Sequence, residues 1–388
     1  MADKEKSRSV LQNGSALSLD SVVASGDDAI GLLRDYDSMD SLELQLSEFS
    51  NEKTDSELQE KFVPKKKKSF ILADCYKRLG FETKADKVRE CGSFLEFAYA
   101  ISKNGEISKE GKLNHANFCR DRLCPMCSWR RSYKIFGQVS QIMDKIVSDY
   151  SFIFVTLTVR SVTGPELPST IDRLMRSWVK MFRYSRIQKV CKGYFRALEV
   201  TRNTDQGDKS FGLFHPHFHT IIAVPKSYFS SRDYIKQSSW LDYWRKAFKD
   251  PLINQVNVKK CRSKYSINKA SCGANFSLSE AVAEISKYTV KDSDYLFENN
   301  SDLTDDSVFY LSQALKGRRL ASFGGIFKKV FHDLKLQDAE SDDADLVHLD
   351  ENLNSEITYL ICRYGWSMGA YKMTDIYLKD SSEAEIRI

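Results

Sequence analysis

Residues 214–224 read FHPHFHTIIAV and contain three of the six histidines of this 388-residue chain. The apolar run that ends the stretch predicts a strand that enters a hydrophobic core. Because residues two apart on a strand face the same side, His217 and His219 present two neighbouring imidazoles, with Phe218 on the opposite face. Two adjacent imidazoles fill a core poorly, but they can bind one divalent ion. The stretch therefore predicts a metal site on a buried sheet.

A third ligand is expected from a neighbouring strand. The segment YFRALEVT (194–201) alternates so that Glu199 lies on one face with apolar and small neighbours, and a polar, glycine-containing connection follows it. An antiparallel pair of the two strands would bring Glu199 close to the two histidines. A carboxylate with two histidines suits Mg²⁺ or Mn²⁺ held with open positions, as phosphoryl transfer requires. The direction of His215 stays open, because Pro216 disturbs regular pairing there.

A second set of metal-ligand residues lies in the motif CRDRLCPMC, which contains Cys119, Cys124 and Cys127. The last two form a CxxC pair, whose spacing lets two thiolates bind one tetrahedral ion from a tight turn. Cys91 is the expected fourth ligand, since it precedes a glycine, and His115 is the alternative. The motif predicts a structural Zn²⁺ site.

The cysteine count and the N-terminal sequence bear on the cellular compartment. Nine cysteines, an odd number, follow an N-terminus that reads MADKEKSRSV and lacks an apolar leader. Thiols and metal ligands are therefore expected rather than a disulfide framework. No apolar run approaches the roughly 18 residues of a membrane helix, so we expect a cytoplasmic protein without a membrane partner. The cysteines expected to be ordinary buried thiols are Cys75, Cys191, Cys261, Cys272 and Cys362.

The net charge of +5 hides an asymmetry. Residues 1–60 hold fourteen acidic and five basic residues, a net charge of −9, so the remainder carries +14. We expect residues 1–68 to form an acidic, disordered tail that ends in the run Lys65–Lys68, a solvated linker.

The basic body indicates a polyanionic partner. The segment from Ile171 to Phe182 places apolar residues at helical spacing and basic residues on another stripe. Arginines also flank the CxxC motif, and several such basic segments favour phosphate contacts. The candidate phosphate-binding residues are Arg120, Arg122, Arg130, Arg131, Arg176, Lys180 and Arg183.

A further motif, SLSEAVAEISKYTVKDSDY, predicts a helix capped by Ser277 or Ser279. Its expected buried side consists of Ala281, Val282 and Ile285. Glu284 and Tyr288 are one turn apart on one face, and Lys291 follows three residues later. A tyrosine phenolate that attacks a phosphodiester forms a covalent phosphotyrosine, and a nearby carboxylate can activate water for later hydrolysis.

Three of these segments, in this order, resemble the motifs of the HUH rolling-circle replication initiators. They are FIFVTLTV (152–159), HPHFH (215–219) and EISKYTVKDSDY (284–295). The resemblance is closest to the plasmid Rep family typified by staphylococcal plasmids. The cysteine motif and ALKGRRLASFGGIFKKV (314–330) are also similar to that family, so the resemblance runs from about Cys91 to Val330.

The resemblance implies an α+β chain with an HUH endonuclease fold. Helices would flank a central antiparallel sheet, and the helix of Tyr288 would lie across its face, beside a cysteine-rich zinc-binding module. The expected divisions are a tail at 1–68, the zinc module at 69–135, the catalytic domain at 136–300 and a C-terminal region at 301–388. This last region would serve origin recognition or dimerisation.

The resemblance also implies a reaction. The protein would nick one strand of supercoiled plasmid DNA at a double-strand origin presented in an extruded hairpin. His217 and His219 would hold the divalent ion, with Glu199 as a less secure ligand. Tyr288 would form a 5′-phosphotyrosine link and leave a 3′-OH that primes rolling-circle synthesis.

The other site residues follow from the same resemblance. Glu284, four residues before the tyrosine, would be the water-activating base that ends replication, and Lys291 would steady the phosphate or the site geometry. Tyr295 could be a second nucleophile, but Lys-Asp-Ser-Asp intervenes in the seven residues after Tyr288, so we expect a single nucleophile. Host helicase and replication proteins would be partners, and the sequence leaves a homodimer open.

Four other functions compete with this interpretation. Conjugative relaxases place the tyrosine ahead of the histidines, whereas Tyr288 follows His219 by 69 residues. HUH transposases keep the order but are smaller and lack the cysteine module. A non-enzymatic zinc-dependent DNA-binding regulator leaves Glu284 and Tyr288 unexplained. A metallohydrolase for small molecules does not need the basic body.

Overall fold

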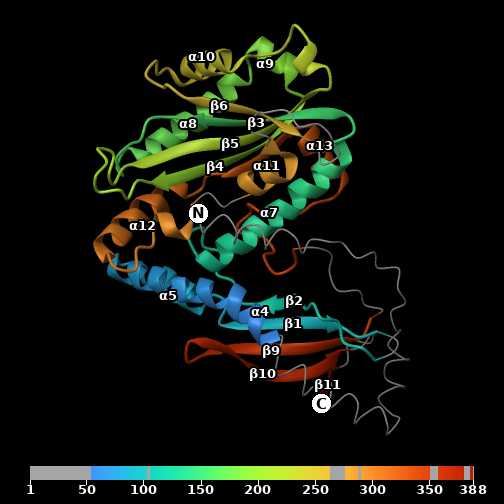
Figure 1. Cartoon of the computed structure of the whole chain (residues 1–388). Coiled ribbons are helices and arrows are strands. Elements are labelled where there is room, and N and C mark those ends of the chain that lie inside the picture. Colours follow the sequence, from blue (N-terminus) through green and yellow to red (C-terminus); the bar gives the residue numbers. More distant parts are fainter. Residues whose placement is uncertain are drawn as a thin grey trace.

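The computed structural model of the chain describes residues 54–102, 105–262, 276–286, 290–349, 357–379 and 385–387. These residues form two sheets, which are antiparallel apart from one short edge pairing, and helices lie against both (Figure 1). The α+β class is therefore as predicted. None of the described helices is both long and apolar enough to cross a membrane.

The helices and strands follow one another along the chain without grouping by type. The first half contains α4 (Thr54–Lys61), α5 (Val63–Arg78), α6 (Glu82–Glu90), β1 (Phe94–Ala100), β2 (Lys112–Ala116), α7 (Pro125–Ile146), β3 (Tyr150–Thr158), α8 (Leu167–Met181), α9 (Ser185–Val190) and β4 (Gly193–Arg202). The middle contains β5 (Phe214–Pro225), η1 (Tyr228–Ser230), α10 (Gln237–Phe248), β6 (Val256–Arg262), β7 (Phe276–Ser277), α11 (Leu278–Ile285) and η2 (Asp292–Asp294). The last part contains α12 (Ser301–Leu315), β8 (Ala321–Gly325), α13 (Ile326–Asp333), β9 (Tyr359–Ser367), β10 (Ala370–Lys379) and β11 (Glu385–Arg387).

The larger sheet has the strand order β7-β6-β3-β5-β4-β8, with β5 between β3 and β4. Residues on both sides of these strands are buried, which explains why β3 and β5 read as nearly continuous apolar runs. Successive side chains along each strand point to opposite faces of the sheet, and each face has its own hydrophobic core. One core contains α8, α10 and α12, and the other contains α7, α11 and α13.

Helix α11 lies on the same face of the sheet as the alternating positions of β4 and β5 that include Glu199 and His219. Ser277 caps this helix in a reciprocal capping box with Glu280, as one of the two predicted caps. The predicted buried side is confirmed, since Ala281, Val282 and Ile285 are all buried. The helix ends at Ile285, earlier than the predicted pairing of Glu284 with Tyr288 requires, and Tyr288 itself lies outside the described residues.

The second sheet has the order β11-β10-β9-β1-β2, so strands from the two ends of the chain pair with each other. Meanwhile α12, β8 and α13, which follow residue 300, pack against or join the larger sheet. The predicted domains at 69–135, 136–300 and 301–388 therefore do not coincide with the two sheets. Segments from more than one predicted domain contribute to each sheet. Strand pairing between distant segments is the reason, because such pairing leaves little local signal in the sequence.

The lysine run is not the end of a solvated linker. Lys65–Lys68 lie within helix α5, and Lys66 is fully buried, with its Nζ donating to the carbonyls of Arg89 at 2.6 Å and Cys91 at 2.9 Å. The predicted tail boundary at residue 68 is therefore wrong, since described helices begin at Thr54. The remainder of the predicted tail, residues 1–53, lies outside the described residues.

Candidate active site and metal centres

Glu199, His217 and His219 converge on one face of the larger sheet. The register of β4 and β5 places Glu199 directly opposite His217 and places His219 opposite Ala197. Oε2 of Glu199 lies 3.3 Å from Nε2 of His217 and 2.8 Å from Nε2 of His219. The two imidazole Nε2 atoms are 3.1 Å apart. The predicted antiparallel pairing thus brings the three predicted ligands together.

Neighbouring groups orient the two imidazoles. Nδ1 of His217 lies 3.1 Å from the carbonyl oxygen of His215, which accepts a hydrogen bond from this nitrogen. Nδ1 of His219 lies 3.2 Å from Oγ1 of Thr156, which faces it from β3. The ring of His215 stacks on that of His217 with centroids 5.1 Å apart. Such outer hydrogen bonds fix ring orientation in metal sites.

The donor set fits a divalent ion. One oxygen and two nitrogens lie within 4.8 Å of one another, a separation suited to ligand bonds of about 2.0–2.2 Å. Burial acts to raise the pKa of Glu199, but hydrogen bonds from His217 and His219 outweigh it and hold that pKa far below its ordinary value. The carboxylate is therefore ionised and able to bind a cation.

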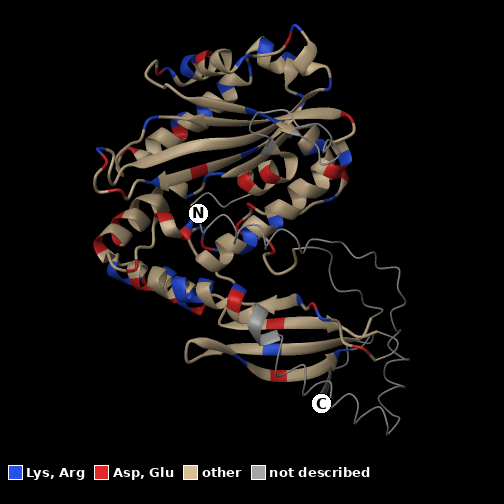
Figure 2. Ribbon diagram, in the orientation of Figure 1, with Lys and Arg blue, Asp and Glu red and all other residues tan. Residues whose placement is uncertain are grey.

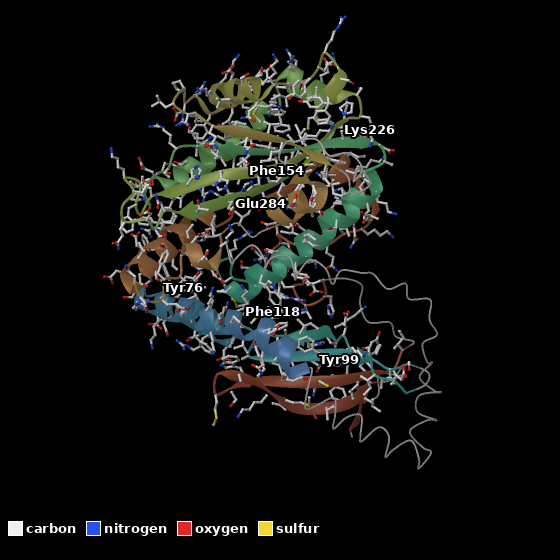
Figure 3. The ribbon with its side chains drawn as sticks, viewed as in Figure 1. Tyr76, Tyr99, Phe118, Phe154, Lys226 and Glu284 are labelled. Carbon is white, nitrogen blue, oxygen red and sulfur yellow. The ribbon has the colours of Figure 1, made fainter. Side chains whose placement is uncertain are left out.

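Two of the predicted reaction residues border this cluster. Lys291 places Nζ 3.3 Å from Oε1 of Glu199. Burial lowers the pKa of Lys291, but the charges of Glu199, Asp294 and Glu284 raise it above its ordinary value. Glu284 lies on α11 and is half-buried, and it is labelled in Figure 3 on the helix that packs against β3 and β5. A cation and a further carboxylate thus lie on the same side as the three ligands.

Tyr295 is unsuited to be a second nucleophile. Its side chain is 1% exposed, and its hydroxyl donates to the carbonyl of Leu123. A hydroxyl so engaged in the core cannot reach a phosphodiester. Tyr288, the predicted nucleophile, remains a prediction from the sequence.

The four cysteines predicted as zinc ligands also lie together. Sγ of Cys91 is 3.5 Å from Sγ of both Cys124 and Cys127, and Sγ of Cys119 is 3.7 Å from that of Cys127. All four sulfurs lie within 4.8 Å of one another. His115, the alternative ligand, has a side chain that is 72% exposed and lies near Glu96 instead. Cys91 is therefore the residue that completes the group.

The cysteine cluster fits a tetrahedral ion. Four thiolates at about 2.3 Å from zinc would stand about 3.8 Å apart, close to the observed separations. The backbone N–H groups of Cys119 and Arg120 point at the sulfurs of Cys91 and Cys127, at 3.3 Å and 3.1 Å. Burial acts to raise the pKa of Cys124, but hydrogen bonds from the other three thiols lower it well below its usual range.

Local backbone geometry brings these thiols into position. Gly92 follows Cys91 with a φ of +65°, a left-handed turn that glycine adopts without strain. Cys124 occupies the N-cap position of α7, and Pro125 lies in the first turn of that helix. Helix α7 then runs from the cysteine cluster to the larger sheet, where it packs in the same core as α11 (Figure 1).

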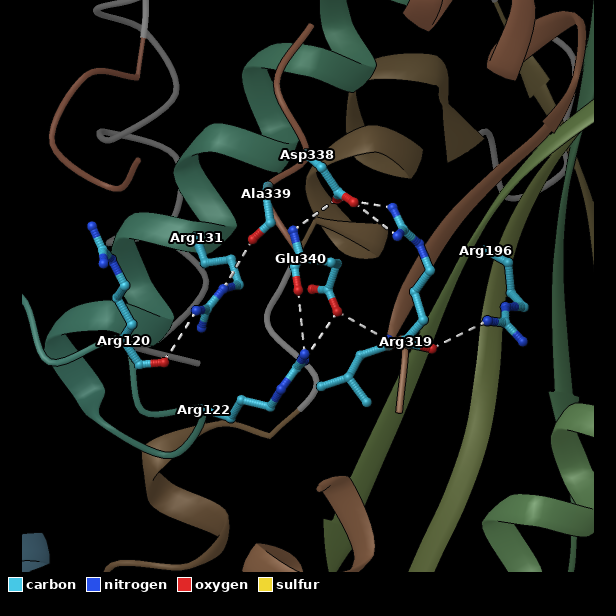
Figure 4. A network of polar contacts seen from close by, with 9 residues as sticks. Arg120, Arg122, Arg131, Arg196, Arg319, Asp338, Ala339 and Glu340 are labelled. Atoms are coloured by element: carbon cyan, nitrogen blue, oxygen red, sulfur yellow. Dashed lines mark hydrogen bonds and ion pairs between the residues drawn. The ribbon is translucent and has the colours of Figure 1, made fainter. Parts of the chain in front are cut away.

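Three of the arginines predicted to bind phosphates are engaged within the protein. Arg122 pairs with Glu340 at 3.0 Å, and Arg131 donates to the carbonyls of Ala339 and Arg120 (Figure 4). Arg130 donates to the carbonyls of residues 346 and 347 and is 7% exposed. The segment 337–347 thus lies along α7 and occupies these guanidinium groups, because buried cations require partners. Arg120 is the member of this group with an exposed side chain, and phosphate binding by Arg122, Arg130 and Arg131 would require these internal contacts to break.

The predicted basic stripe of α8 lies on the other side of the larger sheet. Arg176, Lys180 and Arg183 are exposed, while Leu174 and Trp178 pack in the core opposite to that of α11. In Figure 2 the Lys and Arg residues, coloured blue, are spread along several helices of the ribbon. These three residues therefore face solvent away from the histidine–glutamate cluster.

Sequence reasoning missed some contributors to the site. Thr156 had a signal, because it alternates with buried residues in the first motif and faces the histidine strand. Asp292 pairs with Lys65 and Lys68 across more than two hundred residues, and spacing alone cannot reveal such a contact.

Comparisons with known proteins agree on one family. A family model described as a replication protein, Rep_1, matches residues 110–373. A protein named Protein rep from Bacillus amyloliquefaciens is 37% identical over 303 residues, which cover 74% of this chain and 85% of that protein. Another Protein rep, from Streptococcus pneumoniae serotype 2, is 34% identical over 75% of this chain and 83% of its own length. A third, from Staphylococcus aureus, is 36% identical over 63% of this chain and 98% of its own length. No solved structure matches the chain significantly.

Proposed function

This chain belongs to the Rep_1 family of replication proteins, and we propose that it initiates plasmid replication by nicking one strand of its origin. Family membership supports a role in replication. The observation that carries the nicking reaction is the convergence of Glu199, His217 and His219 beside α11. The arrangement of this helix across a mostly antiparallel sheet supports an HUH endonuclease fold.

In the proposed reaction Tyr288 is the nucleophile. Its phenolic oxygen loses its proton to solvent and attacks the scissile phosphorus. The bond from phosphorus to the 3′ oxygen breaks, and that oxygen keeps the bonding electrons and takes up a proton. The products are a 5′-phosphotyrosine and a free 3′-OH that primes rolling-circle synthesis. Because one phosphoester replaces another, the step is reversible and permits rejoining.

His217, His219 and Glu199 would hold Mg²⁺ or Mn²⁺ in this proposal. Bound there, the ion would supply Lewis-acid polarisation of the scissile phosphate. The protein residues orient the imidazoles, through Thr156 and the carbonyl of His215, and keep the carboxylate ionised. Lys291 adds a positive charge beside Glu199, where it can meet a phosphate oxygen.

Glu284 is proposed to end a round of replication by activating water. Its position on α11 and its electrostatic influence on Lys291 support a place at this site. We expect Glu284→Ala to nick origin DNA at a rate within about tenfold of wild type but to remain attached at termination. Normal release of the DNA by this variant, followed on a denaturing gel, would assign water activation to another residue.

The cysteine cluster is proposed to bind one structural Zn²⁺. Its place at the first turn of α7 supports a role in holding that helix. Origin DNA in supercoiled form is the proposed substrate, with host helicase and replication proteins as later partners in the cytoplasm.

The decisive experiment uses a supercoiled plasmid that carries the protein's own origin. In Mg²⁺ or Mn²⁺ we expect wild-type protein to form open circles and to stay linked to the 5′ end. Tyr288→Phe should abolish both without changing origin affinity, whereas Tyr133→Phe, at an exposed tyrosine of α7, should behave as wild type. Undiminished cleavage by Tyr288→Phe would remove the assigned nucleophile. Origin binding without any cleavage by wild-type protein would favour a non-enzymatic regulator.

A further inference from the structure

The turn that follows the predicted nucleophile is joined to the lysine run of helix α5. Asp292 accepts from Nζ of Lys68 at 2.9 Å and from Nζ of Lys65 at 3.5 Å. The Asp292 side chain is only 16% exposed, and both lysines are about one-third exposed. Two cations thus converge on one half-buried carboxylate from a segment more than two hundred residues away.

Helix α5 is itself fixed to the cysteine cluster. Lys66, between the two clamping lysines, is fully buried and donates to the carbonyls of Arg89 and Cys91. A buried ammonium with two good acceptors is costly to displace, so the helix has a fixed position and rotation. The positions of Lys65 and Lys68 are therefore fixed by the packing of helix α5.

The turn of Asp292 touches the histidine–glutamate cluster on its other side. Lys291, the preceding residue, places Nζ 3.3 Å from Oε1 of Glu199. Val290 and Tyr295 are each 1% exposed, and the Tyr295 hydroxyl donates to the carbonyl of Leu123, next to Cys124. The turn thus lies between the two candidate metal centres and is held from both.

We propose that Asp292, clamped by Lys65 and Lys68, is a positioning residue for strand cleavage. It fixes Lys291 beside Glu199 and sets the start of the turn that follows Tyr288. The inference rests on the proposed nicking function and adds a role for the lysine run, whose Lys65 and Lys68 bind a carboxylate of the same chain. It also makes cleavage depend on the packing of helix α5.

The charge state of the clamp predicts how its loss affects a pH profile. Burial acts to raise the pKa of Asp292, but Lys65 and Lys68 outweigh it and lower the pKa below its ordinary value. Asp294 lies in the same turn, and the charge of Asp292 contributes to raising the pKa of Asp294. Asp292 is therefore ionised from about pH 6 to pH 9. Loss of the clamp should lower the cleavage rate by the same factor throughout this range.

The test is a double-mutant cycle in the full-length protein. The measured quantity is the rate of single-turnover nicking at saturating origin DNA. Asp292→Asn should lower the rate about tenfold or more, because small displacements of reacting groups are costly, while the Kd for origin DNA changes less than about twofold. The double variant Lys65→Gln/Lys68→Gln should show the same loss, and the triple variant should be no slower than either. Asp292→Glu should recover part of the rate.

Lys67→Gln provides the matched control. Lys67 is exposed on the same helix, so this variant removes one lysine charge from that helix without touching Asp292, and we expect wild-type nicking. The proposal would be overturned if the losses of nicking rate add in the triple variant. It would also be overturned if Lys67→Gln lowers the rate as much as the double variant does. Thermal unfolding of each variant separates loss of rate from loss of fold. If Tyr288→Phe cleaves while the cycle is still non-additive, the proposed nucleophile fails and the clamp does not.

Discussion

The cysteine cluster and the histidine–glutamate cluster differ in donors and in surroundings. The first has four like donors, three of them on fully buried residues, and backbone N–H groups point at two of its sulfurs. The second has mixed donors and is bordered by Lys291 and by helix α11. A closed set of four thiolates suits structural zinc, whereas three protein ligands leave positions for a substrate. The difference separates a structural role from a chemical one.

The two clusters also differ in how the chain assembles them. Register alone places Glu199 opposite His217, and a single residue of the strand, Phe218, separates His217 from His219. In contrast, Cys91 lies 28 residues from Cys119, across a hairpin and a loop. The sheet can therefore order the histidine site without an ion, whereas the cysteine site depends more on the bond energy of the metal.

The largest expected effect follows from the loss of one thiolate. We expect Cys124→Ala to lose tightly bound zinc and to lower the melting temperature by about 10 °C or more, because structural zinc contributes several kcal/mol of folding free energy. Metal analysis of purified protein and thermal unfolding measure the two consequences. Wild-type protein should retain about one zinc per chain.

Cys362→Ala is the matched control for that variant. Cys362 is fully buried but lies apart from the four clustered thiols, so its loss should cost only about 1 kcal/mol of packing and no zinc. Equal effects from both variants would remove the distinction between a metal ligand and a core thiol.

The second prediction concerns the histidine site, where we expect a loss of nicking without a loss of stability. We expect His219→Ala to lower the nicking rate by about a thousandfold, since the loss of ion-mediated charge stabilisation costs several kcal/mol in the transition state. Its melting temperature and zinc content should stay close to those of wild type, because the sheet register does not depend on this side chain. Single-turnover nicking and differential scanning calorimetry provide the measurements.

His215→Ala tests whether the effect is specific to a ligand. The His215 ring stacks on His217, but its nitrogens are not among the clustered donor atoms. A loss of less than about tenfold is expected for this neighbour. Should His215→Ala prove as damaging as His219→Ala, the ligand set would have to be redrawn.

The third prediction concerns α7, the helix that begins at the cysteine cluster and packs against the larger sheet. Arg131 is 2% exposed and donates to two carbonyls, so Arg131→Met should lower the free energy of unfolding by about 2–3 kcal/mol. Arg120→Met, at an exposed side chain, should change stability by less than about 0.5 kcal/mol. Urea unfolding measures both. If instead Arg131→Met leaves stability intact and weakens origin binding, the guanidinium contacts phosphates and not segment 337–347.

The sequence predicted those features that depend on local periodicity. The two-residue spacing of His217 and His219, the CxxC pair and the serine cap of α11 are all readable from neighbours along the chain. Glu199 was found because its strand and the histidine strand follow one another through a single connection.

Features that depend on distant segments were not predictable in this way. The sequence gives Arg130 and Arg131 a basic character, but it does not show that segment 337–347 covers them. Likewise Lys66 reads as part of a charged run, although its ammonium is buried against two carbonyls. Charge patterns predict exposure only where no later part of the chain packs over them.

The smallest expected effect tests how the two sides of the molecule are joined. Arg78 of α5 donates to both carboxylate oxygens of Asp305 of α12, at 2.8 Å and 2.6 Å. Burial acts to raise the pKa of Asp305, but hydrogen bonds from Arg78 and Cys75 lower it below its ordinary value. The pair therefore stabilises the fold above the ordinary aspartate pKa of about 3.9, and this contribution is lost as the pH falls through the lower folded pKa.

Asp305→Asn should accordingly lower the free energy of unfolding by about 0.5–1 kcal/mol at pH 7, since the partly exposed pair is screened by solvent. The difference from wild type should shrink toward zero as the pH falls below about 4, whereas Glu298→Gln, at an exposed residue, should show little difference at either pH. A difference that grows in acid would contradict the lowered pKa. No measurable difference at neutral pH would mean that the continuous core beneath α5 and α12, and not this ion pair, holds the two sides of the molecule together.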